Sequence, residues 1–148
     1  MHQPESSENA ACHCTTLRKA SRYLSQYYDS VLAASGIKTT QRAILAQLRR
    51  EGSQSVSGLA EALVMDRGGL THTLKPLQRD GLISLGADPD DGRSRLISLT
   101  DSGYKKLTET DAGWALAQRQ VETQLGAKES MMLQALLTSV ISSDFDET

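Results

Sequence analysis

The stretch from Ser55 to Gly81, SVSGLAEALVMDRGGLTHTLKPLQRDG, decides the fold of this chain. Its apolar residues recur at spacings of three and four in both halves, which is the spacing of a helix with one buried side. Ser55 and Asp66 can each accept hydrogen bonds from the free amides that begin a helix, and Gly81 can end the second helix. Two short helices joined tightly at Val64-Met65 form a helix-turn-helix unit.

A β-hairpin is predicted directly after this unit. The sequence LISL occurs at residues 82–85 and again at 96–99, and both copies are short β-prone runs. Between them, ADPDDGRSR at 87–95 is dense in Asp, Pro and Gly, as a turn requires. A hairpin that follows a helix-turn-helix makes a winged helix.

Long amphipathic helices flank the winged helix on both sides. Upstream, Leu17, Leu24 and Val31 lie on one stripe of a helix predicted from about Ala10 to Ala33, which Ser35-Gly36 ends. A second helix follows through Leu48, with Thr39 or Thr40 as its cap, and Glu51-Gly52-Ser53 closes it. Downstream, Thr100 caps a long helix that runs to Gly126, and a last helix carries apolar residues from Leu133 to Ile141.

The terminal helices carry more apolar surface than a small winged helix can cover within one subunit, so the sequence predicts a homodimer. The predicted fold class is mainly α with a small β-hairpin wing, a winged helix-turn-helix whose N- and C-terminal helices form a dimerisation domain. We assign residues 1–9 to a disordered N-terminus, 10–36 and 104–148 to the dimerisation helices, and 37–103 to the DNA-binding winged helix.

Composition limits the classes of protein to which the chain can belong. Its 148 residues, 39% of them apolar, suffice for one domain or one intimate oligomer. We expect a soluble cytoplasmic protein, because no apolar run resembles a secretory segment or reaches the length of a membrane span. The net charge is −2, but residues 15–50 hold seven cations against one acid, which permits a basic face.

The element order, together with MDRGGLTHTLKPLQRDGLI at 65–83 and DPDDGRSRLISLTDSG at 88–103, resembles the MarR family of bacterial winged-helix transcription regulators. The resemblance covers roughly residues 12–142 and is most specific in the wing. It implies that the helix after Asp66 enters the major groove of double-stranded DNA and that the wing reaches an adjacent minor groove. It also implies a homodimeric repressor that binds a palindromic operator and leaves it on binding an effector or on oxidation.

Short hydroxyl and basic side chains on the polar side of the second helix suit base edges and phosphates. At the wing, Arg93 and Arg95 are the best candidates for a narrow minor groove. As an alternative role for one of them, we choose Arg93 to pair with Asp88 or Asp91 and hold the wing in shape. The complete set of residues expected to contact DNA is Ser55, Arg67, Gly68, Gly69, Thr71, His72, Thr73, Lys75, Arg93 and Arg95.

The glycines at positions 68, 69 and 92 depart from the family pattern. Gly68-Gly69 stands in the first turn of the recognition helix, where relatives often carry bulkier residues. Pro76 lies inside that helix and predicts a kink near Lys75, and Gly92 replaces an arginine that many relatives have in the wing. The glycines favour an alternative function, a winged-helix protein-interaction module with weak or lost DNA binding.

Both cysteines of the chain lie in Ala11-Cys12-His13-Cys14. Positions two apart point away from each other on a helix, which disfavours a disulfide within the chain and weakens a metal site. Cys14 lies near a helix start with Arg18 one turn later, and both features favour thiolate. Cys14 therefore remains either a packed residue of the dimer interface or a peroxide-sensitive thiol.

The family resemblance bears on this choice. In the branch that senses organic hydroperoxides, a reactive cysteine resembles Cys14 in its distance before Gly36, and a tyrosine matching Tyr28 reaches it from the other subunit. A second tyrosine of that branch corresponds to Arg18 here.

The resemblance also places small-molecule effectors between the dimerisation helices and the winged helix. Aromatic and cationic residues that can line such a cleft suit a small aromatic carboxylate or phenol. With the two thiols, the candidate effector or redox residues are Cys12, Cys14, Arg18, Arg22, Tyr23, Tyr27, Tyr28 and Trp114.

We expect no enzyme, no metal site and no cofactor. Asp88, Asp90 and Asp91 form a cluster of carboxylates on a polar turn, but no nucleophile or base accompanies them.

Overall fold

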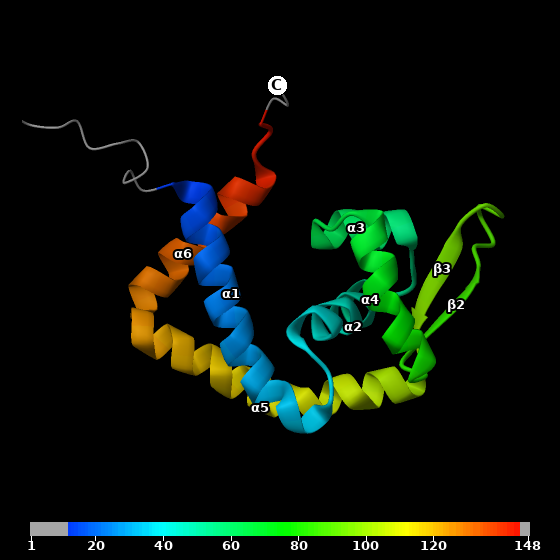
Figure 1. Ribbon diagram of the computed structural model, residues 1–148, viewed down its shortest axis with the longest axis horizontal. Coiled ribbons are helices and arrows are strands. Elements are labelled where there is room, and N and C mark those ends of the chain that lie inside the picture. Colours follow the sequence, from blue (N-terminus) through cyan, green and yellow to red (C-terminus); the bar gives the residue numbers. More distant parts are fainter. Residues whose placement is uncertain (1–11, 146–148) are drawn as a thin grey trace, which may run out of the picture.

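The computed structural model describes residues 12–145 of the chain and confirms the mainly α, winged-helix fold with its small β-hairpin wing. The use of the terminal helices for dimerisation stays a prediction, and the N-terminus assigned as disordered, residues 1–9, lies outside the described residues. In Figure 1, α5 forms a long base, with α1 and α6 at one end and the winged helix at the other. The elements, in order, are α1 (His13–Leu32), the 3-10 turn η2 (Ala33–Ser35), α2 (Thr39–Glu51), β1 (Gln54–Ser55), α3 (Val56–Leu63), α4 (Arg67–Arg79), β2 (Ile83–Ala87), β3 (Arg95–Leu99), α5 (Asp101–Leu125) and α6 (Ala127–Ser142).

Three predicted helix caps are confirmed. The side chains of Ser55, Asp66 and Thr100 accept hydrogen bonds of 3.0–3.1 Å from the backbone N–H three residues later, at the starts of α3, α4 and α5. The connection between α3 and α4 turns at Val64, whose φ of 53° is left-handed. Helix α4 runs through Pro76 to Arg79.

The predicted cap of α2 is wrong. Thr39 is already the first helical residue, and Lys38 precedes it in extended conformation. The Asp29 carboxylate accepts from the backbone N–H of Thr39 at 2.7 Å and from its hydroxyl at 2.6 Å, while Gln41 Oε1 accepts from the backbone N–H of Lys38. The Asp29 carboxylate of α1 therefore caps the start of α2 in place of a residue adjacent in sequence.

The sheet has three antiparallel strands in the order β1-β3-β2. The hairpin pairs Ile83 with Leu99 and Ala87 with Arg95. The sequence did not predict β1, in which Gln54 pairs with Ile97. This extra strand ties the start of the helix-turn-helix to the wing.

The core lies inside the winged helix. Leu70, Leu74 and Leu77 form the buried side of α4, as predicted, and they pack with residues of α2, α3, β2 and β3. From α5, Leu107 alone joins this cluster of buried residues. The long helix is therefore anchored in the core by its N-terminal part.

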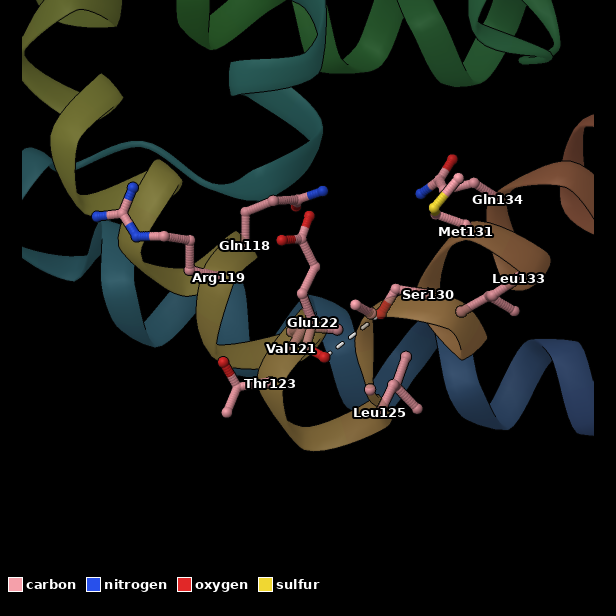
Figure 2. A pocket seen from close by; sticks show the side chains of 12 residues that line it. Gln118, Arg119, Val121, Glu122, Thr123, Leu125, Ser130, Met131, Leu133 and Gln134 are labelled. Carbon is pink, nitrogen blue, oxygen red and sulfur yellow. Dashed lines mark hydrogen bonds between the residues drawn. The ribbon is translucent and has the colours of Figure 1, made fainter.

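The terminal helices leave apolar surface uncovered in a single chain. Helix α6 has no buried residue, and Met131 and Leu136 are 76% and 63% exposed. A cavity of about 730 Å³ lies between the C-terminal half of α5 and α6. Figure 2 shows Glu122 from α5 and Gln134 from α6 among its lining side chains. In residues 12–145, no helix has the length and apolar character needed to cross a membrane.

Candidate functional site

The recognition helix α4 presents a polar face opposite its three buried leucines. Arg67, Gly68, Thr71, His72 and Lys75 are exposed there. Thr73 and Gly69, which we also expected to contact DNA, are half-buried. The structure therefore gathers five of the predicted residues on one solvent-facing side of a single helix.

The threonine hydroxyls on α4 are already oriented by the helix. Thr71 Oγ1 donates to the carbonyl of Arg67 at 2.8 Å, and Thr73 Oγ1 donates to the carbonyl of Gly69 at 3.0 Å. Each hydroxyl hydrogen is thus used within the helix, and the oxygen retains acceptor capacity for an external donor.

The first turn of α4 explains one of the two unusual glycines. The Asp66 side chain folds over this turn to accept from the backbone N–H of Gly69 at 3.0 Å. A Cβ added to Gly69 would lie 2.8 Å from Asp66 Oδ1, whereas one added to Gly68 would lie 3.3 Å from Asp66 Oδ2. Gly69 therefore makes room for the cap.

Ser55 has a structural task at the start of α3. Its hydroxyl accepts from the backbone N–H of Gly58 at 3.1 Å, and the residue pairs with Leu96 in the sheet. The side chain is half-buried, so any contact of Ser55 with DNA depends on the same oxygen that caps the helix.

In the wing, the predicted pairing of Arg93 with Asp88 or Asp91 is wrong. Asp91 instead accepts from the backbone N–H of Arg93 at 3.0 Å and from Ser94 Oγ at 3.2 Å, and Asp88 accepts from the backbone N–H of Asp90. Short carboxylates reach nearby turn amides without ordering a long side chain. Within residues 12–145, neither Arg93 nor Arg95 forms an ion pair, and both are exposed.

Some of the predicted effector residues come together where α1 meets α5. The rings of Tyr28 and Trp114 lie 4.4 Å apart between centroids, and Tyr27 contacts Tyr28 edge-on at 5.6 Å. The Tyr28 hydroxyl donates to Gln118 Oε1 at 2.7 Å. Burial raises the pKa of the Tyr28 phenol, so its hydrogen remains available for this bond at neutral pH.

The other predicted effector residues are placed differently. Arg18, Arg22 and Tyr23 are exposed on α1, with Tyr23 75% accessible. They line neither the cavity between α5 and α6 nor a smaller one of about 230 Å³ bordered by Val31, Ser35 and Thr110. In a single chain, the predicted effector set is therefore split between the aromatic group and the open surface of α1.

The sequence did not reveal a charged group beside these aromatic rings. Arg42 of α2 is 8% exposed; its Nε donates to Thr110 Oγ1 and its Nη2 to Asp111 Oδ1, both at 2.9 Å. The guanidinium carbon lies 4.3 Å from the centroid of the Trp114 ring. Arg49 also binds Asp111 through two hydrogen bonds of 2.8 and 3.0 Å. A cation on the leucine-rich side of the predicted second helix was the only local sign of this group.

Two opposing effects act on the ionisation of this charged group. The hydrogen bonds from Arg49 lower the pKa of Asp111, with a further contribution from Arg42. Burial lowers the pKa of Arg42, and the neighbouring Asp111 carboxylate opposes that change. Both partners remain ionised near neutral pH, since a guanidinium holds its proton even when partly desolvated.

The two thiols lie at the start of α1, and both are free and exposed. Cys12 precedes the helix in extended conformation, with φ of −85° and ψ of 117°. The helical-face argument against a link between Cys12 and Cys14 therefore does not apply, because Cys12 is outside the helix. Hydrogen bonds from the backbone and side chain of Thr15 lower the pKa of the Cys12 thiol. The sequence predicts a thiol that favours thiolate at Cys14, whereas the structure places these hydrogen bonds at Cys12.

Comparisons with known proteins agree on one family. The model of the MarR family matches residues 37–94, from the start of the winged helix to the wing. The organic hydroperoxide resistance transcriptional regulator of Bacillus subtilis is 34% identical over 90 residues, which are 61% of this chain and 61% of that protein. The chain thus spans less than two thirds of this relative.

Solved structures cover the chain more fully. A probable transcriptional regulator from Pseudomonas aeruginosa is 31% identical, with a TM-score of 0.71, over 80% of this chain and 92% of its own. The M. tuberculosis transcriptional regulator MosR, solved in complex with DNA, is 29% identical, with a TM-score of 0.74, over 90% of this chain and all of its own. These names describe regulators and not enzymes. The chain belongs to the MarR family of winged-helix transcription regulators.

Proposed function

We propose that this protein is a homodimeric, cytoplasmic transcription repressor that binds a palindromic operator in double-stranded DNA. The observation that carries the proposal is the exposed polar face of α4 together with two exposed wing arginines, Arg93 and Arg95, which form no ion pair within residues 12–145. An α-helix fits the major groove, and guanidinium groups are attracted to a narrow minor groove. The M. tuberculosis relative was solved in complex with DNA, which supports DNA binding by this chain.

Dimerisation would supply the second recognition helix. The uncovered apolar side chains of α6, including Met131 and Leu136, favour burial against a second copy. Twofold symmetry places two identical reading helices on two half-sites of one palindrome.

Binding of DNA from the gene's own promoter, compared with a random duplex of equal length, tests the proposal. We expect preference for the promoter fragment and a steep loss of affinity as salt rises, because phosphate contacts release counterions. Arg67→Ala should weaken binding, whereas Lys128→Ala, which removes an equally exposed cation from α6, should not. Equal affinity for both duplexes would contradict the proposal.

A protein-interaction module is the second candidate, and Gly68 and Gly92 favour it because both offer no side chain to DNA. Affinity of such a module for its partner need not fall with salt. Salt-independent binding of a protein partner, with no binding to any duplex, would replace the repressor by this function.

Release from DNA is the second part of the proposal. We propose that a small aromatic effector near Tyr28 and Trp114, or oxidation of Cys14, lowers affinity for the operator. The name of the B. subtilis relative, which refers to organic hydroperoxide resistance, supports an oxidant, as does the exposure of both thiols.

Measuring operator affinity before and after mild organic hydroperoxide tests the oxidative route. We expect release from the unmodified protein, none from Cys14→Ser, and a changed oxidation product from Cys12→Ser. Release that persists in Cys14→Ser would exclude this sulfur and leave Cys12 as the thiol to test. No release of the unmodified protein by hydroperoxide would leave an aromatic effector as the remaining signal.

A further inference from the structure

A polar group joins the winged helix to the base helix. We call Arg42 and Arg49 of α2 together with Asp111 and Trp114 of α5 the α2–α5 clamp. The cluster of buried apolar residues in the winged helix extends along α5 only to Leu107. The clamp therefore begins one turn beyond the last α5 residue of this cluster.

Each contact in the clamp has a defined direction. The Asp111 carboxylate accepts hydrogen bonds from two guanidinium groups of α2. Arg42 is buried, and Arg49 lies at the surface. Arg42 is held on three sides, by Thr110 Oγ1, by Asp111 Oδ1 and by the Trp114 ring. A planar guanidinium satisfies all three only in one orientation, since its donors form a rigid fork.

The clamp also reaches α1. Tyr28 packs against Trp114 with ring centroids 4.4 Å apart and ring planes tilted by 45°, and its hydroxyl donates to Gln118 Oε1, one helical turn along α5. Trp114 thus contacts α2 through Arg42 and α1 through Tyr28. One ring connects the winged helix to the helices we assign to dimerisation.

We propose that the α2–α5 clamp sets the angle of the winged helix to α1 and α5, and thereby the half-site spacing that the dimer accepts. This inference rests on the proposed DNA-binding function. Buried ion pairs add little net stability compared with apolar packing, but they can specify one arrangement over its neighbours. One base pair inserted between half-sites moves them apart by about 3.4 Å and rotates them by about a tenth of a turn. Asp111 and Arg42 are then positioning residues that never touch DNA.

Apolar replacement separates orientation from stability. In the double variant Arg42→Met with Asp111→Leu, both charges of the pair are removed together, so the buried Arg42 guanidinium is not left without its partner. Arg49 also loses Asp111, but its side chain is at the surface, where water solvates the charge. Asp111→Asn is a milder second variant, because its amide oxygen still accepts from the arginines. Glu109→Gln is the matched control: it removes an exposed carboxylate from the same helix, where Lys106 is its only ion-pair partner within residues 12–145, at 3.8 Å.

The probe is a duplex that the unmodified protein selects from a random library, together with versions carrying one base pair more or one fewer between the half-sites. We expect the unmodified protein and Glu109→Gln to lose about tenfold or more in affinity on either altered duplex. We expect the double variant to lose less than about threefold, with a melting temperature close to that of the unmodified protein. Asp111→Asn should fall between them and should shift the emission of Trp114, the only tryptophan of the chain.

The outcomes separate the two proposals. If the unmodified protein selects no duplex, both the repressor function and this inference fail. If it selects a duplex with strict spacing and the folded double variant keeps that strictness, the repressor function stands and the clamp has no part in spacing. A general loss of affinity at all spacings, with the preference unchanged, would likewise overturn the inference. Should the double variant not fold, Asp111→Asn and the half-exposed Arg49→Ala decide the question by the same measure.

Discussion

Gly103 is the residue on which the junction between the wing and α5 depends. A Cβ at this position would overlap the carbonyl oxygen of Leu82 and lie 2.7 Å from Leu99 Cδ1. Thr100 stabilises the same junction. Its hydroxyl donates to the Gly81 carbonyl at 2.6 Å and accepts from the backbone N–H of Gly103 at 3.0 Å. This close approach gives a physical reason for the glycine in the Leu99-Thr100-Asp101-Ser102-Gly103 motif.

Gly103→Ala should therefore lower the free energy of unfolding by about 3 kcal/mol, the upper end of the usual cost of overpacking. Urea denaturation measures the effect. Gly113→Ala is the matched control on the same helix: its Cβ would meet only Val31 Cγ1 at 3.4 Å, and the higher helix propensity of alanine favours stabilisation by up to about 1 kcal/mol. Equal effects of the two substitutions would contradict the packing argument.

Whether a cap could be predicted depended on where its acceptor lies. Ser55, Asp66 and Thr100 accept hydrogen bonds from three residues away, and their positions follow from local sequence. At Thr39 the acceptor is Asp29, ten residues earlier and on another helix. The sequence could not show that contact, because it exists only once α1 and α2 have packed.

The wing combines local turn chemistry with exposed cations. Asp88 and Asp91 accept hydrogen bonds from backbone amides of the turn, and within residues 12–145 Arg93 and Arg95 form no ion pair, which leaves both guanidinium groups accessible to an external partner. The hairpin strands were predicted to within a few residues, because alternating apolar residues and an Asp-Pro-Gly tip are local signals. The two-residue strand β1 was missed, since its pairing with β3 spans more than forty residues of chain.

Arg95→Ala should weaken binding to all duplexes by a similar factor and reduce the slope of log affinity against log salt by about one, as expected when one phosphate contact is lost. Titrations at several salt concentrations measure both quantities. A slope that does not change would remove Arg95 from the interface. Lys128→Ala, on α6, should leave the slope as it is.

The junction between α1 and α2 is stabilised by an ionised carboxylate. Hydrogen bonds from Thr39 lower the pKa of Asp29. Because the folded pKa lies below the unfolded value of about 3.9, this contribution is complete well above that pH and is lost as pH falls through the folded pKa. Lys106 Nζ also donates to the Ser35 carbonyl at 2.9 Å and so ties the same linker to α5.

Asp29→Asn should therefore be less stable than the unmodified protein at neutral pH, and the difference should shrink below about pH 4. Urea unfolding at a series of pH values gives this difference directly, with other titrating groups cancelling between the two proteins. A difference that stays constant down to pH 3 would mean that the ionised carboxylate does not stabilise the junction.

Across the molecule, α5 is the element that the other parts share. Its N-terminal part lies in the core of the winged helix, its middle forms the α2–α5 clamp, and its end lies beside α6. Sequence periodicity could predict each helix but not the clamp. Arg42 and Asp111 are 69 residues apart, and neither carries a local signal that names the other. Each helix can be predicted from the pattern of residues close in sequence. Contacts between helices, such as that of Arg42 with Asp111, become visible only in the three-dimensional structure.

The exposed apolar side chains of α6 favour dimerisation through this helix. Leu136 is 63% exposed on a helix that buries none of its own residues in a single chain. If a second copy covers this surface, a buried carboxylate there would be costly, and Leu136→Glu should yield a monomer by analytical ultracentrifugation. The monomer would retain one recognition helix, so its affinity should fall toward that of non-specific binding. Tyr104→Glu, which places the same charge on an exposed position of α5 near the wing, should remain dimeric. A dimer that survives Leu136→Glu would move the interface away from α6 and leave its apolar surface to another partner.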